Sequence, residues 1–349
     1  TRTETDICVV GDGELPFIKL LEYIDKHPKH DDFDYDELSK IKGLGYLKPG
    51  NSLNVNGNGE ALSASEASDL HYPDYEVLNR ELEKFSGVPN LVNRFFGTIN
   101  SLDQLKEFMA QQLYPEAIKF YENNKNKKVA EIRSAQGCVA RCTFCQRYIK
   151  GYRPYSPQDF ESHLIELKEK HNVALLFLND ENALSNKKQA YQIAKVFKKH
   201  NMYWTAQGVR ATTCTYEDLK FYKENNLLAI RFGIESGSQK ILDIMEKKIT
   251  IQNARNALEN CKKLKIGVAT DMFMLGMPGE TTETVLESAK LSGELRYMVG
   301  KNWNVENTPL AMAIPGTPLY EYSQQIGVIG ASIEEEEDYL YRTSEFSNK

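Results

Sequence analysis

Three of the six cysteines in this chain are close neighbours in the segment GCVARCTFCQR. Cys138, Cys142 and Cys145 have the spacing CxxxCxxC, and thiolates ligate zinc, copper(I) or iron–sulfur clusters. A structural zinc ion takes four protein ligands, and no local histidine motif supplies the fourth. A disulfide would leave one thiol of the trio unpaired. The spacing therefore favours a 4Fe-4S cluster that is held by three cysteines and keeps one iron open.

The cysteine segment follows the first of several short apolar runs that alternate with helical patterns. Continuous apolar runs such as VALLFL, each followed by a helix, predict a parallel sheet that is buried on both faces. We expect an α/β fold with a partial (β/α)6 TIM-like barrel, in which the cysteine segment lies at the carboxyl end of the first strand. The predicted strands are Val129–Arg133, Val173–Leu178, Met202–Gln207, Leu227–Ile234, Gly267–Leu275 and Val305–Ile314.

Start signals and apolar stripes support the predicted helices. The segments SPQD, from Ser156, and TYED, from Thr215, have the form of a capping box. Residues with helical spacing are predicted to face the core: Phe160, Leu164 and Leu167 in one helix, and Ala190, Ile193, Ala194 and Phe197 in the next. The remaining cysteines fall in strand or helical contexts and are predicted to be structural thiols: Cys8, Cys214 and Cys261.

The amino-terminal residues predict a second structural unit. Asp6–Val10, a glycine turn and Leu15–Ile24 read as a strand, a turn and a helix in the style of a Rossmann-like unit. Because the strand begins at once, we expect the natural protein to extend further upstream. The expected division is a Rossmann-like remnant at 1–30, a connecting region at 31–128, the barrel at 129–330 and an acidic carboxyl-terminal extension at 331–349.

Composition and charge narrow the class of protein. Of the 349 residues, 41% are hydrophobic and 26% are charged, as in ordinary soluble proteins. The net charge of −6 disfavours a broad nucleic-acid-binding surface and favours a small-molecule or peptidic substrate. No apolar run approaches the roughly 20 residues that span a bilayer, and the first residues lack a signal-peptide pattern. We therefore expect a cytoplasmic protein without a membrane partner.

The cysteine motif, with Phe144 immediately before the third cysteine, resembles the signature of the radical S-adenosylmethionine (radical SAM) superfamily. The resemblance implies that Cys138, Cys142 and Cys145 ligate a 4Fe-4S cluster and that the Phe144 segment lies against the adenine of S-adenosylmethionine. The amino and carboxylate groups of S-adenosylmethionine would chelate the open iron. Reductive cleavage would then give a 5′-deoxyadenosyl radical, with electrons from a flavodoxin- or ferredoxin-like donor.

The resemblance extends to the ends of the next two predicted strands. Asn179 or Asp180 stands where the superfamily has a Gly-Gly-Glu-like turn, and either side chain could accept hydrogen bonds from the methionyl amino group. Arg210 follows the third strand and could pair with the methionyl carboxylate, because a guanidinium matches a carboxylate in a two-pronged fashion. A surface arginine is the alternative reading of Arg210.

Later strand ends continue the resemblance, which covers Val129 to about Gly327. Glu235 and Ser236 lie in the segment FGIESGS and would bind ribose hydroxyls. Gly276, in the segment GMPGE, and the later segment IPGTP resemble turns at the same face of the superfamily's barrel.

The amino-terminal segment VVGDGE resembles the last stretch of a cobalamin-binding domain, which precedes the barrel in one branch of the superfamily. The DxHxxG motif of such domains does not occur in these residues. With cobalamin, the expected reaction is methyl transfer to an unreactive carbon. The alternatives are radical ring formation or rearrangement, a cluster protein that only transfers electrons or senses oxygen, and a non-enzymatic zinc-stabilised interaction module.

Overall fold

The structure is a computed structural model that describes residues 6–29, 32–48, 50, 52–57, 59, 72, 97–98, 101, 114–147, 151–270, 273–299, 309–330 and 332–347. The chain divides into two compact units. The first comprises Thr1–His71, Gln136–Cys138 and Arg147–Tyr155, and the second comprises Tyr72–Ala135, Val139–Gln146 and Ser156–Lys349. Short strands flank the cysteine segment in the sequence: β6 (Ala135–Gln136) and β7 (Arg153–Pro154).

The first unit contains an antiparallel sheet in the order β1-β2-β3. Its elements are β1 (Ile7–Val9), α1 (Glu14–Lys26), α2 (Tyr35–Leu38), β2 (Leu44–Lys48) and β3 (Ser52–Val55). The predicted strand, turn and helix are present. The returning strand β2 runs antiparallel to β1, whereas the second strand of a Rossmann-like unit runs parallel to the first. Strands β2 and β3 fall within the interval 31–128, for which the sequence predicts a connecting region.

A small core and a buried ion pair hold the first unit together. Leu20 and Tyr23 of α1 pack against Leu38, Leu44 and Tyr46, and the Tyr23 hydroxyl donates to the Asp34 carbonyl at 3.0 Å. The segment that contains β7 joins this unit through an ion pair between Arg153 and Asp12 at 2.9 Å, with both side chains nearly buried.

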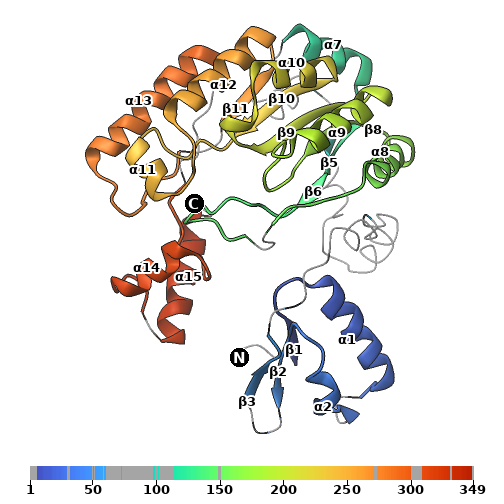
Figure 1. Ribbon diagram of the computed structural model, residues 1–349, viewed down its shortest axis with the longest axis vertical. Coiled ribbons are helices and arrows are strands. Elements are labelled where there is room, and N and C mark those ends of the chain that lie inside the picture. Colours follow the sequence, from blue (N-terminus) through green and yellow to red (C-terminus); the bar gives the residue numbers. More distant parts are fainter. Residues whose placement is uncertain are drawn as a thin grey trace. The chain divides into compact units, whose positions relative to one another are not determined.

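The second unit is built on a six-stranded sheet in the order β11-β10-β9-β8-β5-β4 (Figure 1). The strands are β4 (Gly97–Thr98), β5 (Lys128–Ile132), β8 (Val173–Leu178), β9 (Tyr203–Val209), β10 (Leu227–Phe232) and β11 (Gly267–Thr270). The pairs from β5 to β11 are parallel, which confirms five of the predicted strands. The antiparallel edge strand β4 was not predicted. The predicted sixth strand lies partly outside the described residues, and Leu310 makes a parallel bridge to Leu275.

Helices that follow the parallel strands lie over the sheet (Figure 1). They are α8 (Pro157–His171), α9 (Lys187–Lys199), α10 (Tyr216–Glu224), α12 (Ile251–Leu264) and α13 (Thr282–Val299). The second unit also contains α7 (Pro115–Asn124) before β5, then α11 (Gln239–Ile244), α14 (Pro318–Gln325) and α15 (Ile333–Ser347), with a 3-10 turn at Ala211–Thr213. Both predicted caps form: the Ser156 hydroxyl accepts from the Asp159 N–H, and Thr215 and Asp218 make a capping box.

The predicted apolar stripes form the core between the sheet and the helices. Phe160 and Phe197 are fully buried, and the other residues of both stripes are at most 6% exposed. Trp204 of β9 stacks on Phe197, with 4.9 Å between the ring centroids, and its indole N–H donates to the Asn225 carbonyl at 2.8 Å. Cys214 and Cys261 are buried as predicted, and burial raises the pKa of the Cys214 thiol to about 12. Cys8 of β1 is exposed.

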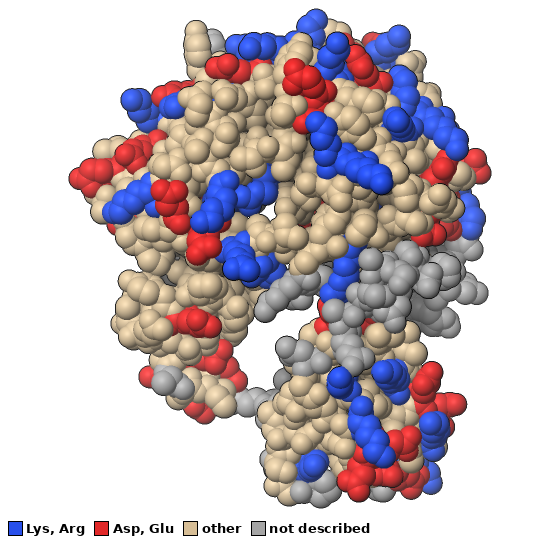
Figure 2. Space-filling model, in the orientation of Figure 1, with Lys and Arg blue, Asp and Glu red and all other residues tan. Residues whose placement is uncertain are grey.

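Surface charge is mixed on the face that Figure 2 draws, where side chains of both signs occur across the second unit. None of the helices in the described part of the chain combines the length and the hydrophobicity that crossing a bilayer requires.

A buried histidine on α8 gives the fold a predicted pH dependence. His163 stacks on Tyr72 with ring centroids 3.8 Å apart, and burial lowers its pKa from 6.5 to about 4. The folded state therefore binds fewer protons than the unfolded state between these values, so stability present above pH 6.5 is lost as the pH falls toward 4. In urea unfolding at pH 7.5 and pH 5, His163→Gln should lose about 2 kcal/mol less than the wild type between the two pH values.

The matched control is His171→Gln, at the end of the same helix, which should keep the wild-type pH dependence. An unchanged pH dependence in His163→Gln would contradict the assignment of this titration to His163.

Candidate functional site

The carboxyl end of β5 is held by side chains that follow β8. Asp180 Oδ1 accepts hydrogen bonds from the backbone N–H groups of Ser134, at 2.7 Å, and Ala135, at 3.2 Å. Asp180 Oδ2 accepts from the Ser134 hydroxyl at 2.6 Å, and Gln189 of α9 donates to the Ser134 carbonyl at 2.6 Å. Burial raises the pKa of Asp180, and the hydrogen bonds from Ser134 offset only part of this rise. This network fixes the turn that leads into the cysteine segment.

The structure changes the interpretation of Asp180. The sequence predicts that Asn179 or Asp180 contacts a ligand amino group, but Asp180 is only 5% exposed and both its oxygens bond to the turn at Ser134. Asn179 is half-buried and donates through its side chain to Glu131 at 2.9 Å. Of the two predicted residues, Asn179 is therefore the candidate that remains.

The three predicted sulfur ligands differ in exposure. Cys142 is 7% exposed, Cys145 is exposed and Cys138 is half-buried. Cys138 belongs to the first unit, and the other two cysteines belong to the second. Among the described residues, no three histidine, cysteine, aspartate or glutamate side chains are grouped closely enough to hold a metal ion. Ligation by the trio therefore stays a prediction.

The middle of the cysteine segment is tied to two helices. The Thr143 N–H donates to the Met245 carbonyl at 3.0 Å, and its hydroxyl donates to the Ile244 carbonyl at 3.1 Å. The Thr143 carbonyl accepts from the Leu319 N–H at 3.0 Å. The carboxyl end of α11 and the start of α14 therefore hold the segment between Cys142 and Cys145.

Arg210 lies beside one of the predicted sulfur ligands. Its Nη1 is 4.0 Å from the Cys142 sulfur, and its Nη2 donates to the Lys247 carbonyl. Arg210 is half-buried, so it is not the solvated surface arginine of the alternative reading. Its pairing with a carboxylate stays a prediction. The chemistry of the donors fits an iron–sulfur cluster, because thiolates hold such clusters and hydrogen bonds to their sulfurs tune them.

Glu235 follows β10 and is held by a lysine that sequence reasoning missed. Lys247 Nζ lies 2.7 Å from Glu235 Oε1, and the two side chains are 10% and 13% exposed. The same ammonium lies 5.9 Å from the centre of the Phe144 ring. No sequence signal marks Lys247, because the adjacent Lys248 is exposed in the structure while Lys247 is buried.

Ser236 and Gly276, also predicted as cofactor contacts, make turns in the structure. Ser236 is fully buried, and its hydroxyl lies 3.2 Å from the Ser288 hydroxyl of α13. It also accepts from the Ser238 N–H at 3.1 Å. The Ser236 hydroxyl therefore faces α13 and is not presented to a ribose. Gly276 is exposed, has a φ of 91°, and donates its N–H to Glu280 at 2.5 Å.

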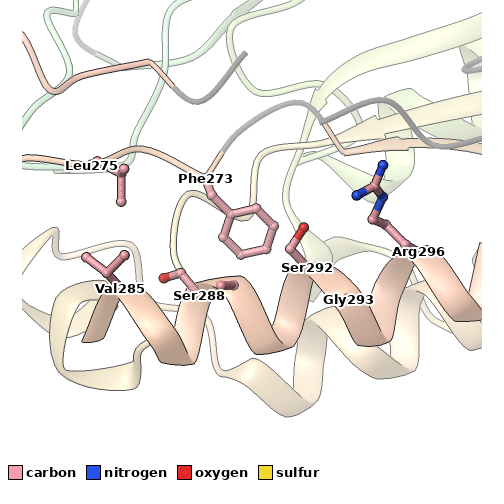
Figure 3. A pocket seen from close by; sticks show the side chains of 8 residues that line it. Phe273, Leu275, Val285, Ser288, Ser292, Gly293 and Arg296 are labelled. Carbon is pink, nitrogen blue, oxygen red and sulfur yellow. The ribbon is translucent and has the colours of Figure 1, made fainter. Parts of the chain in front are cut away.

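A cavity of about 330 Å³ lies along α13, and none of the predicted site residues lines it, although the lining residue Ser288 contacts Ser236. Small side chains at helical spacing leave this room, and Figure 3 shows the Phe273 ring over the helix and Arg296 toward one end. The lining residues are Phe273, Leu275, Val285, Ser288, Ala289, Ser292, Gly293 and Arg296.

The Asp180 network predicts a loss of stability on neutralisation. Asp180→Asn should lower the free energy of unfolding by about 2 kcal/mol, because an amide cannot accept all three bonds from Ser134 and Ala135. Urea unfolding followed by circular dichroism measures the change. The exposed neighbour Glu181 provides the control, since Glu181→Gln should stay within about 0.5 kcal/mol of the wild type. Equal stability of the two variants would refute this role of Asp180.

Comparison with solved structures supports the fold. A structure of the cobalamin-dependent S-adenosylmethionine radical enzyme OxsB superposes with a TM-score of 0.62 at 15% identity, over 92% of this chain and 45% of that chain. A structure of the radical S-adenosylmethionine methyltransferase TsrM from Kitasatospora setae gives a TM-score of 0.63 at 17% identity, over 93% and 57%. These likenesses concern the fold.

Sequence comparison identifies relatives of the chain and a matching superfamily model. An uncharacterized methyltransferase of Pyrococcus horikoshii is 26% identical over 91% of this chain and 58% of its own length. An anaerobic magnesium-protoporphyrin IX monomethyl ester cyclase of Rubrivivax gelatinosus is 26% identical over 58% of this chain and 36% of its own length. The chain thus spans about half the length of these relatives. The radical SAM superfamily model matches residues 132–292 of this chain, which confirms the resemblance to that superfamily over this segment.

Proposed function

We propose that this chain cleaves S-adenosylmethionine reductively at a 4Fe-4S cluster ligated by Cys138, Cys142 and Cys145. One observation carries the proposal. Within the second unit, Arg210 reaches both the Cys142 sulfur and the Lys247 carbonyl, while Lys247 reaches Glu235 and Phe144. Residues from separate strand ends therefore surround the cysteine segment, at the edge where barrels of this type have their active sites.

A bound cluster would supply the electron that splits S-adenosylmethionine into methionine and a 5′-deoxyadenosyl radical. The protein's own residues bind and orient the cofactor. Arg210 pairs with the methionyl carboxylate, and the Asn179 side chain accepts from the methionyl amino group. Glu235 accepts hydrogen bonds from ribose hydroxyls, and the Phe144 segment lies against the adenine. Such positioning lowers the barrier by fixing the reacting groups before reaction.

We further propose methyl transfer to an unreactive carbon, with cobalamin as the second cofactor of the full-length protein. The relative named as a methyltransferase matches 91% of the chain, and the OxsB and TsrM structures contain cobalamin by their descriptions. The DxHxxG motif does not occur in these residues, so they do not supply that histidine ligand themselves.

A radical cyclase is the second candidate. The match to the magnesium-protoporphyrin ester cyclase favours it, although that match covers only 58% of the chain. The substrate in either case is a small molecule or a peptide, the electron donor is a flavodoxin- or ferredoxin-like protein, and the reaction takes place in the cytoplasm. Product analysis separates the two, because transfer of a labelled methyl group from S-adenosylmethionine occurs only in the first.

The cluster proposal predicts the metal content. Anaerobically purified protein should be brown, with about four irons and four sulfides per chain, and should release 5′-deoxyadenosine from S-adenosylmethionine when reduced. Cys142→Ala should lose both the iron and the nucleoside product. Iron analysis and chromatography of the products measure these outcomes.

Cys214→Ala provides the matched control. Its thiol is buried in the core and lies outside the cysteine segment, so this variant should keep its iron. A colourless wild-type protein that contains zinc would contradict the cluster proposal and favour a zinc-stabilised interaction module.

The ribose assignment predicts a binding defect without loss of iron. Glu235→Gln should weaken the affinity for S-adenosylmethionine about tenfold or more, because a hydrogen bond to a charged group contributes roughly 1.5–3 kcal/mol. Anaerobic calorimetry measures the affinity. Glu294→Gln removes a half-exposed ion pair between α12 and α13 and should bind normally. Wild-type affinity in Glu235→Gln would show that Glu235 does not bind the ribose.

A further inference from the structure

Three residues at the end of α11 and in the turn after it contact separate parts of the candidate site in the second unit. The Ile244 and Met245 carbonyls accept from Thr143, in the middle of the cysteine segment. The Lys247 carbonyl accepts from Arg210. The Lys247 ammonium pairs with Glu235 at 2.7 Å. The turn 244–247 is therefore the common support of three groups that come from distant parts of the sequence.

The Lys247 side chain is buried and held by its ion pair with Glu235. Lys247 is 8% exposed, and a lysine is rarely so buried unless it has a partner. The pair lies directly over Gly233: a Cβ there would come within 2.8 Å of Glu235 Oε1 and 3.2 Å of Lys247 Nζ. A glycine at this position lets the ion pair approach the end of β10.

The pairing uses only one side of the Glu235 carboxylate. Lys247 engages Oε1, and none of the described residues donates a hydrogen bond to Oε2. Glu235 itself has a φ of 70°, in the left-handed region, where a bulky residue is held at a cost by its surroundings. The ion pair therefore fixes the direction of a carboxylate whose second oxygen stays available as an acceptor.

We propose that Lys247 is a positioning residue for S-adenosylmethionine. Its ammonium orients Glu235 toward the nucleoside end of the cofactor, and its carbonyl orients Arg210 toward the methionyl end. This inference rests on the proposed function. It adds that the turn after α11 sets the distance between the two recognition groups and ties both to Thr143.

The test compares variants of Lys247 by anaerobic calorimetry with S-adenosylmethionine, together with iron content. Lys247→Met keeps the apolar stem and removes the charge, so its affinity should fall about tenfold or more while iron stays at the wild-type level. Lys247→Arg keeps the charge and should bind within about threefold of the wild type. If the Lys247 side chain only filled buried volume, Lys247→Met would bind S-adenosylmethionine more tightly than Lys247→Arg. Lys248→Met, at the exposed neighbour, is the control and should bind normally.

A double-mutant cycle tests whether Lys247 acts through Glu235. The combined Lys247→Met and Glu235→Gln variant should bind no more weakly than the weaker single variant, because both remove one function. The inference would be overturned if the loss of affinity in the double variant equalled the product of the losses in the two single variants. Wild-type affinity in Lys247→Met would overturn it as well. Should Lys247→Met not fold, Lys247→Gln takes its place with the same two outcomes. Absence of iron and of cofactor binding in the wild type would instead contradict the proposed function.

Discussion

Parallel pairing of the strands β5, β8, β9, β10 and β11 fixes where the candidate residues lie. Ile132 is level with Leu178, and Leu178 is level with Ala206, so neighbouring strands end at one edge. The residues that follow each strand meet there without needing any similarity in sequence. Asp180 can therefore hold the turn after β5, and Arg210 can reach Cys142, although 68 positions separate that pair in the chain.

Charge at this edge differs from that of the whole chain. The chain has a net charge of −6, yet Arg210 and Lys247 both lie beside the cysteine segment, with Glu235 as the carboxylate that pairs with one of them. Thiolate ligands and the carboxylate of an amino acid are both anionic, so two cations held by backbone and side-chain bonds suit such ligands. Their placement on a rigid sheet edge also preorganises them.

Much of the fold could be predicted because its signals are local. Phe160 and Phe197 lie on apolar stripes whose helical spacing is written in adjacent residues, and the structure buries both. Roles that depend on a distant partner were harder to predict. Asp180 and Ser236 follow the carboxyl ends of strands, where ligand-binding residues of such folds lie. In the structure, however, their side chains contact Ser134 and Ser288. Lys247 belongs to no motif, because its role arises only when α11 returns the chain to Glu235.

The central claim is that three thiolates leave one iron of a cluster open for S-adenosylmethionine. The most direct test is electron–nuclear double resonance on the anaerobically reduced protein, with S-adenosylmethionine carrying a nitrogen-15 label in its methionyl amino group. The account predicts a nitrogen coupling strong enough to require direct coordination to the cluster. A fully formed cluster that shows no coupling to the label in the presence of saturating cofactor would contradict it.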